Sequence, residues 1–563
     1  MKEASVEVSD IRLQLATMLK QKSRNNWLLE GASNTSFFHT SINIHRRSNI
    51  ISELVNDNGV TITDYDQIRD LAVNYFENKF NGDSSIPVDS LFDVDHASIS
   101  VEESTRMDQF PTQEEIHEAV FNLGADSALG PDGFAGFFYR HCWEIIRDDL
   151  GVNLSLLLLF PKERGANTLK NFRPIGLSNF FFKIFTKILA TRLGSVLGNL
   201  VSEEQVSFMK GINIHENISL ASEMVNELQI KRKEGNVGLK LDITQDFDTG
   251  DPLSPLIFVL IEDVLSRNIT KLFPEGKHEK FEESGSSLNS YQRASCQTVS
   301  REKSKLYYGG GSLWRRATIS GFLGMNVVTF PDRYVGVKVM SGDVKYHHVS
   351  NVVEKIKDQL SSWKGRMLSF QVRVVLVKSV IVSYSIHNMA VYKWPRKFIH
   401  QCEVAIRNFV WSGDSQVSIS FMVAYNKVYA PYNEDGLGIT QMRVMNKAIL
   451  MKLCWNICSS KKAWAGYLRA KFFKKSGQLV GYRKSSIFPG FKWVYNEVNV
   501  NTKVLSGDGR ATSLYFDSWC EETCIVNAIG PENLDHNLLV VDCIQNGEWI
   551  LTELVTQKCL QMV

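Results

Sequence analysis

The segment Leu239–Pro255, LKLDITQDFDTGDPLSP, joins two pieces that can take part in chemistry. Apolar and polar residues alternate from Val237 to Ile243, which predicts a strand carrying Lys240 and Asp242 on the face opposite its apolar residues. GDPLSP is typical of a tight turn that opens a helix. Hard divalent cations require carboxylate oxygens as ligands. Asp242 can therefore belong to a metal site only if other carboxylates lie close to it.

The elements around this segment predict an α+β chain in which helix dominates. PTQEEIHEAVFNLG (Pro111–Gly124) predicts a helix that starts with a Thr112–Glu115 capping box. Residues 178–201 predict an amphipathic helix with Phe185 in its apolar stripe and with Lys183, Lys187 and Arg192 away from that stripe. YVGVKVM (334–340) predicts a short strand, followed by amphipathic basic helices up to about residue 473.

Length and composition indicate an intracellular globular protein. The chain has 563 residues, of which 44% are hydrophobic and 22% charged, enough for several cored domains. Its longest strongly apolar run, Leu154–Phe160, is too short to span a membrane, and the N-terminus lacks secretion-signal features. We therefore expect nuclear or cytoplasmic localisation without secretion, no membrane partner, and reduced thiols for the nine cysteines.

Charge is distributed unevenly along the chain. Residues 51–120 contain 16 acidic and 3 basic side chains, whereas residues 351–480 contain 20 basic and 6 acidic ones, a net charge of +14. The basic region interleaves aromatic rings with cations, a pattern that nucleic-acid surfaces share with ordinary solvated helices. Its candidate nucleic-acid-binding residues are Trp363, Lys364, Arg366, Arg373, Lys378, Lys393, Arg396 and Lys397.

Motifs in a fixed order resemble the reverse transcriptase of plant non-LTR (LINE-type) retrotransposons. They are SRNNWLLEGASNTSFFH (23–39), ALGPDGF (128–134), LFPK (159–162), NFRPIGLSNFFFKIFTKILATRL (171–193), LKLDITQDFD, GDPLSP, YQRASCQTVSREKSKLYYGG (291–310), RYVGVKV (333–339) and the segments beginning at 361 and 434. The resemblance covers about residues 10 to 520. It departs from the family pattern at Ala32, where Asp is usual.

The resemblance implies roles for single residues. Asp242 matches the catalytic aspartate that ligates Mg²⁺, and Phe247 matches the ring that excludes a ribose 2′-hydroxyl, although a core aromatic is an alternative for Phe247. Lys162 and Arg173 match the fingers cations that clamp the incoming triphosphate. Gly250 matches the backbone position that approaches the nucleotide. RNA and DNA are the implied partners, and dNTP is the implied small-molecule substrate of the intact family.

The family's Ala-Asp-Asp hairpin has no counterpart in this sequence. It should lie between about Ile269 and Tyr291, but the stretch 270–290 contains no aspartate, and the chain's single Asp-Asp pair, Asp148-Asp149, precedes Asp242. Asp248-Thr249 also runs directly into Gly250, without the helix that the family has there. Because one carboxylate cannot hold two divalent cations, we expect Mg²⁺ not to bind productively and the motif strand to lack a neighbour.

The sequence therefore predicts a degenerate RNA-directed DNA polymerase that is catalytically inactive, built on a remnant of the right-hand fingers, palm and thumb fold. A nucleic-acid-binding protein that uses the basic thumb, and a relic without selected function, are the alternatives. Cys520, Cys524, His536 and Cys543 are spaced too loosely to indicate a zinc site. The predicted segments are a helical lead-in (1–80), an acidic linker and helix (81–125), degenerate fingers and palm (126–312), a basic helical thumb and post-thumb region (313–480) and a small C-terminal region (481–563).

Overall fold

The computed structural model describes residues 50–80, 96–146, 155–272, 288–417 and 427–550, with internal gaps of one to five residues, and isolated residues between 40 and 47. Two compact units make up the chain. The first contains residues 1–212, 239–306 and 314–326, and the second contains residues 213–238, 307–313 and 327–563. Strands β5 (Asn236–Lys240), β8 (Lys305–Gly309) and β9 (Asn326–Val327) form a sheet in the order β5-β8-β9.

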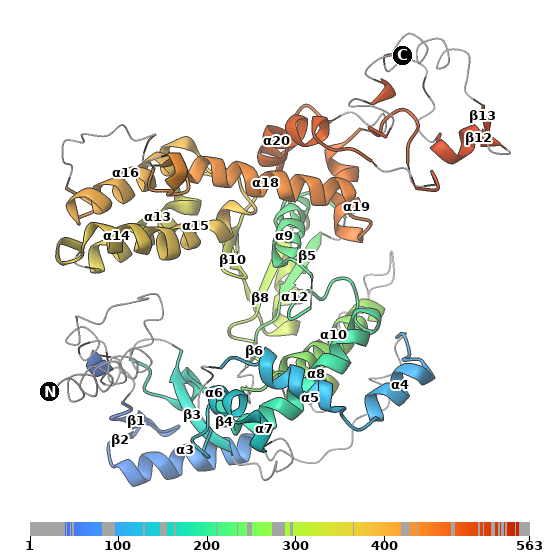
Figure 1. Cartoon of the computed structure of the whole chain (residues 1–563). Coiled ribbons are helices and arrows are strands. Elements are labelled where there is room, and N and C mark those ends of the chain that lie inside the picture. The colour runs from blue at the N-terminus through green and yellow to red at the C-terminus, as the bar shows by residue number, and fades with distance from the viewer. Residues whose placement is uncertain are drawn as a thin grey trace. The chain divides into compact units, whose positions relative to one another are not determined.

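The first unit combines short hairpins with helices (Figure 1). Its other strands are β1 (Leu54–Val55), β2 (Thr61–Ile62), β3 (Ser155–Pro161), β4 (Phe172–Ser178), β6 (Ile243–Thr244) and β7 (Thr298–Val299). Its helices are α3 (Tyr65–Phe80), α4 (Val101–Asp108), α5 (Gln113–Asn122), α6 (Gly136–His141), α7 (Trp143–Ile146), α8 (Phe180–Leu200), α10 (Ser254–Leu272) and α12 (Leu313–Leu323).

Helix α5 confirms the capping box that its sequence predicts. Thr112 Oγ1 accepts the Glu115 N–H at 3.2 Å, and the Glu115 carboxylate accepts the Thr112 N–H at 3.1 Å. Val120 is buried with Phe180 and Ile184 of α8 in one hydrophobic cluster. A second cluster joins β1, α3 and β4 around Leu54, Phe76 and Phe172.

Helix α8 departs from its predicted face, because two of its cations are buried. Arg192 is 5% exposed, and its guanidinium donates to both oxygens of Glu115, at 3.0 and 2.7 Å. Lys183 is 6% exposed, and burial lowers the pKa of its ammonium. Phe185, expected in the apolar stripe, is exposed. The pattern missed this arrangement because α5 supplies a carboxylate that makes burial of Arg192 favourable.

The second unit is mainly helical (Figure 1). Its helices are α9 (Ile214–Leu228), α13 (Tyr346–Ser362), α14 (Phe370–Leu376), a π-helical turn (Val377–Ile381), α15 (Val382–Met389), α16 (Arg396–Ser412), α18 (Met442–Ser459), α19 (Ala463–Phe472) and α20 (Phe488–Val500). Its hairpins pair β10 (Asp332–Tyr334) with β11 (Val337–Val339) and β12 (Ile544–Gln545) with β13 (Glu548–Trp549). The helix-rich α+β class is confirmed, and the polymerase-fold remnant stays a prediction.

One helical segment of the described chain, Phe370–Met389, is long and apolar enough to cross a membrane by length and composition alone. A third of its most apolar window is buried inside the protein. It runs through α14, the π-helical turn and α15, and it packs against α13 and α16. Core helices of soluble proteins also meet this test.

Candidate functional site

The hairpin of β3 and β4 places Lys162 and Arg173 on one face. Phe160 pairs with Arg173, and the Lys162 N–H extends the ladder by donating to the Asn171 carbonyl at 2.8 Å. In this register Lys162 and Arg173 are diagonal neighbours at the turn end of the hairpin. Both side chains are exposed, and Lys162 Nζ donates to the Lys170 carbonyl at 3.0 Å. The structure thus brings the two predicted phosphate-binding cations together.

Asp242 lies between β5 and β6 and is half-buried. Its N–H donates to Ser304 Oγ at 3.0 Å, and its carbonyl accepts the Ser300 N–H at 2.8 Å. Immediately after it, Ile243 pairs with Val299 in the antiparallel β6–β7 ladder. The expectation that this strand lacks a neighbour is therefore wrong, because the segment 298–309 supplies β7 beside β6 and β8 beside β5. All residues of β5 are half-buried, so the predicted alternation does not appear in their exposure.

The turn that opens α10 packs tightly against β4. Gly250 has a φ of +67°, and a Cβ at this position would overlap the carbonyl oxygen of Gly176. Gly250 therefore lies beside the strand that carries Arg173. Asp251 is buried and caps α10: its Oδ1 accepts the Leu253 and Ser254 N–H groups at 2.7 and 3.0 Å, and its Oδ2 accepts the Ser254 hydroxyl at 2.7 Å. Phe247 lies outside the described residues.

The described carboxylates do not fit a site for two divalent cations. No group of three or more His, Cys, Asp or Glu side chains that could hold a metal ion occurs among them. Asp251, the aspartate nearest to Asp242 in sequence among the described residues, uses both oxygens to cap α10. Of the zinc candidates, Cys520 and His536 lie outside the described residues, while Cys524 Sγ contacts Ser518 Oγ at 3.2 Å.

Several of the candidate nucleic-acid-binding residues make contacts within the second unit. Arg373 donates to the carbonyls of Leu368, Val410 and Trp411 and so satisfies the end of α16. Arg366 pairs with Asp414 at 3.3 Å, Lys378 lies 4.3 Å from the ring centroid of Tyr432, and Trp363 packs on Phe409. Lys364 lies outside the described residues. These contacts favour a structural role for Arg373 in particular.

Lys393, Arg396 and Arg443 form a group of exposed cations, here called the Lys393 cluster. Lys393 Nζ lies 4.9 Å from the ring centroid of Trp493 on α20. Partial burial, and then the charges of Arg396 and Arg443, lower the pKa of the Lys393 ammonium. Arg396 is the first residue of α16, whose first turn has neither a side-chain cap nor an acidic residue. Positive charge at the positive end of the helix dipole is unfavourable, so an anion bound here would be stabilised.

Sequence reasoning identified Lys393, Arg396 and Lys397 but missed Arg443 and Trp493. Lys397, the second residue of α16, is also exposed. Arg443 and Trp493 lie on α18 and α20, far along the chain, and join the cluster only through helix packing. An arginine in the first turn of a helix without an acidic neighbour in that turn, as in MRVMNK, is the one local signal that could have identified Arg443.

No protein-family model matches the chain. A putative ribonuclease H protein of Arabidopsis thaliana is 25% identical over 181 residues, which cover 30% of this chain and 28% of that protein. An uncharacterized 149 kDa protein of transposon TX1 from Xenopus laevis is 25% identical over 249 residues, covering 41% and 19%.

A retrovirus-related Pol polyprotein from the type-1 retrotransposable element R2 of Nasonia vitripennis is 28% identical over 134 residues, covering 22% of this chain and 13% of that protein. The chain spans less than a third of the length of each of these relatives. Their similarity supports a retrotransposon origin for this chain.

Proposed function

We propose that the chain is a degenerate reverse transcriptase of a plant non-LTR element that no longer polymerises DNA. The absence of aspartate from residues 270–290 is the observation that carries this proposal. Nucleotide addition needs two divalent cations held by converging carboxylates, and Asp242 is the one matching ligand in the described chain. Electrostatic stabilisation by those cations supplies most of the rate, so its loss removes activity by many orders of magnitude.

Primer extension on a primed RNA template tests the proposal. Purified full-length protein is assayed with Mg²⁺ and then Mn²⁺, beside an Asp242→Ala variant. We expect no extension from either protein. Extension by the parent that disappears in the variant would show that other residues replace the missing aspartates, and the proposal would be wrong. Protease sensitivity or aggregation centred on residues 237–300 would instead favour a relic without selected function.

We propose nucleic-acid binding through the Lys393 cluster as a second function, with RNA or DNA as the partner. The observation that favours it is the grouping of three exposed cations beside Trp493 at an uncapped helix start. Nuclear or cytoplasmic localisation would suit both proposals. Phosphate contacts make affinity fall with salt, and each contact removed lowers the slope by about one.

Salt-dependent binding of a labelled single-stranded RNA tests this second function. Arg396→Gln and Arg443→Gln should each weaken binding and reduce the salt slope by about one. Lys452→Gln, which removes an exposed cation elsewhere on α18, is the matched control and should change neither quantity. If the parent and the three variants show the same dependence of affinity on salt, the Lys393 cluster does not take part in nucleic-acid binding.

A further inference from the structure

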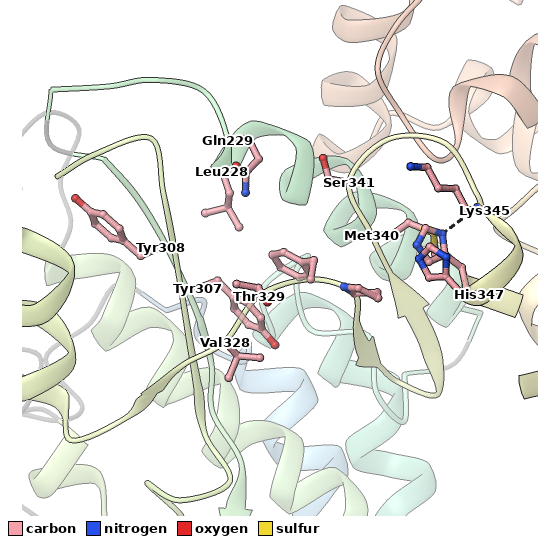
Figure 2. A pocket seen from close by; sticks show the side chains of 13 residues that line it. Leu228, Gln229, Tyr307, Tyr308, Val328, Thr329, Met340, Ser341, Lys345 and His347 are labelled. Carbon is pink, nitrogen blue, oxygen red and sulfur yellow. Dashed lines mark hydrogen bonds between the residues drawn. The ribbon is translucent and has the colours of Figure 1, made fainter. Parts of the chain in front are cut away.

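A pocket of about 280 Å³ lies within the second unit (Figure 2). Its lining residues differ from the candidate site residues discussed above. One side is formed by the end of α9 and the other by the chain that leads into α13. Ligand pockets commonly have volumes of about 300–1,000 Å³, so this one suits a ligand of about one base or nucleoside.

An aromatic surface forms part of its wall. The rings of Tyr307 and Phe330 are stacked, with centroids 4.5 Å apart and planes 15° apart. The Tyr307 hydroxyl donates to the Asp332 carboxylate, and burial followed by this bond raises the pKa of Tyr307. Tyr307 therefore stays neutral. Leu228 and Met340 complete an apolar lining against which a flat ring can pack.

Neutral polar groups, a lysine and a second histidine complete the pocket. His348 is buried, and its Nδ1 accepts the Lys345 N–H at 3.0 Å, so the ring proton of the neutral imidazole is on Nε2. Gln229 adds an amide that can donate and accept. Lys345 and His347 are exposed on the side where α13 begins (Figure 2). None of the described residues that line the pocket is acidic, and Lys345 lies at its rim, so the lining favours an anion even though Asp332 accepts the Tyr307 hydroxyl nearby.

We propose that this pocket binds one nucleotide unit, with its base against the half-buried Phe330, whose ring stacks on the buried Tyr307, and its phosphate at Lys345 and His347. An aromatic ring face attracts any base, and a lysine at the rim neutralises a phosphate. The nucleotide is either free or one residue of a bound single strand, and in the second case the inference rests on the proposed nucleic-acid binding. The Lys393 cluster is built from different residues, so the two sites can be tested separately.

Calorimetric titration of the full chain with AMP, CMP, GMP and UMP, beside adenosine, tests the pocket. We expect at least one nucleotide to bind, and adenosine to bind more weakly than AMP. Phe330→Leu should weaken nucleotide binding about fivefold to a hundredfold, the range of base–aromatic stacking, while Phe330→Tyr keeps the ring and most of the affinity. Lys345→Gln should weaken it about two- to fivefold, and Lys452→Gln should leave it unchanged.

The same variants distinguish the two sources of the nucleotide. Weaker binding of a single-stranded 12-mer by Phe330→Leu, together with competition by the mononucleotide, assigns the pocket to a nucleotide within a strand. An unchanged 12-mer affinity with impaired mononucleotide binding assigns it to a free nucleotide. Arg396→Gln should lower the affinity for the 12-mer without changing the affinity for the mononucleotide. A wrong proposal about the Lys393 cluster can therefore be distinguished from a wrong proposal about the pocket.

Two results would overturn the proposal. One is the absence of mononucleotide binding up to about 10 mM, beyond the millimolar range of weak sites, from a folded protein whose 12-mer affinity is unaffected by Phe330→Leu. The other is nucleotide binding that Lys345→Gln and Phe330→Leu both leave unchanged. Lys345 is exposed, so its variant tests the pocket even if Phe330→Leu fails to fold.

Discussion

Acid is expected to destabilise the start of α13 through His348. This side chain is 6% exposed, and its Nδ1 can accept the Lys345 N–H only while that nitrogen carries no proton. Burial, and then the charges of His347, Lys338 and Lys345, lower the pKa of His348 from 6.5 to about 4. Protonation would both charge a buried ring and break the hydrogen bond that begins the helix.

The sign and size of the effect follow from proton linkage. The unfolded chain takes up this proton as the pH falls through about 6.5, whereas the folded chain resists until about pH 4. The unfolded state therefore binds more protons in this window, and the free energy of unfolding decreases as the pH falls. At about 1.4 kcal/mol for each pH unit, the loss from His348 reaches about 3 kcal/mol by pH 4.

Urea unfolding followed by circular dichroism between pH 4 and 8 measures this loss. His348→Asn retains an acceptor for the Lys345 N–H but has no proton to gain, so it should lose about 3 kcal/mol less than the parent over the same range. His96→Asn changes an exposed histidine that does not affect His348 and is the matched control, which should follow the parent. If the parent and His348→Asn lose stability in parallel between pH 6.5 and 4, the reasoning about His348 is refuted.

Three further substitutions test the packing, each by its thermal melting temperature and urea midpoint. Arg192→Met removes a buried guanidinium from the partly exposed Glu115 and should cost about 2 kcal/mol, and no measurable cost would contradict this contact. Asn446→Leu removes the acceptor of the Trp394 backbone N–H and the donor to the carbonyls of Met389 and Tyr392, and it should cost about 3 kcal/mol or more. Gly250→Ala should lower the free energy of unfolding by about 1–2 kcal/mol because of the positive φ alone, and by more because its Cβ would overlap the Gly176 carbonyl oxygen. An unchanged stability would contradict this conformation of Gly250.

Local signals made parts of the fold predictable. The Thr112–Glu115 capping box acts within four residues, and the structure has it as expected. GDPLSP also opens a helix as predicted, at Ser254, although the sequence did not reveal that Asp251 would cap it. Both features depend on neighbours in the chain, which a pattern records directly.

Other parts were decided by contacts that no local pattern contains. Residues 334–340 suggest one strand, but the chain turns at Val335 and Gly336, which have φ values of +45° and +83°, and forms the β10–β11 hairpin. Val-Gly is not a usual hairpin turn, because a β-branched residue seldom adopts a positive φ. His387 Nε2 donates to the Val335 carbonyl at 2.7 Å, a contact from α15 that helps to hold this turn.

The basic region shows why charge counts alone do not define a binding surface. Arg373 and Arg396 are equivalent in the net charge of +14 for residues 351–480. The structure uses Arg373 to bind three backbone carbonyls, whereas Arg396 is exposed at the start of α16 beside other cations. Only Arg396 therefore presents an accessible guanidinium to a binding partner. The net charge of the region does not distinguish these two arginines, whereas their positions in the fold do.

The strand pairing around Asp242 bears on the proposal that this chain is a degenerate polymerase. If a catalytic hairpin were needed to order this strand, its loss would leave backbone groups exposed and the first unit prone to aggregation. Instead β7 pairs with β6, β8 pairs with β5, and Ser300 and Ser304 bind the backbone of Asp242 itself. The strands around Asp242 thus satisfy backbone hydrogen bonds without an Asp-Asp hairpin. If the chain is the degenerate polymerase proposed above, loss of catalysis is therefore separable from loss of folding around Asp242, and primer extension should be assayed on protein that is shown to be folded.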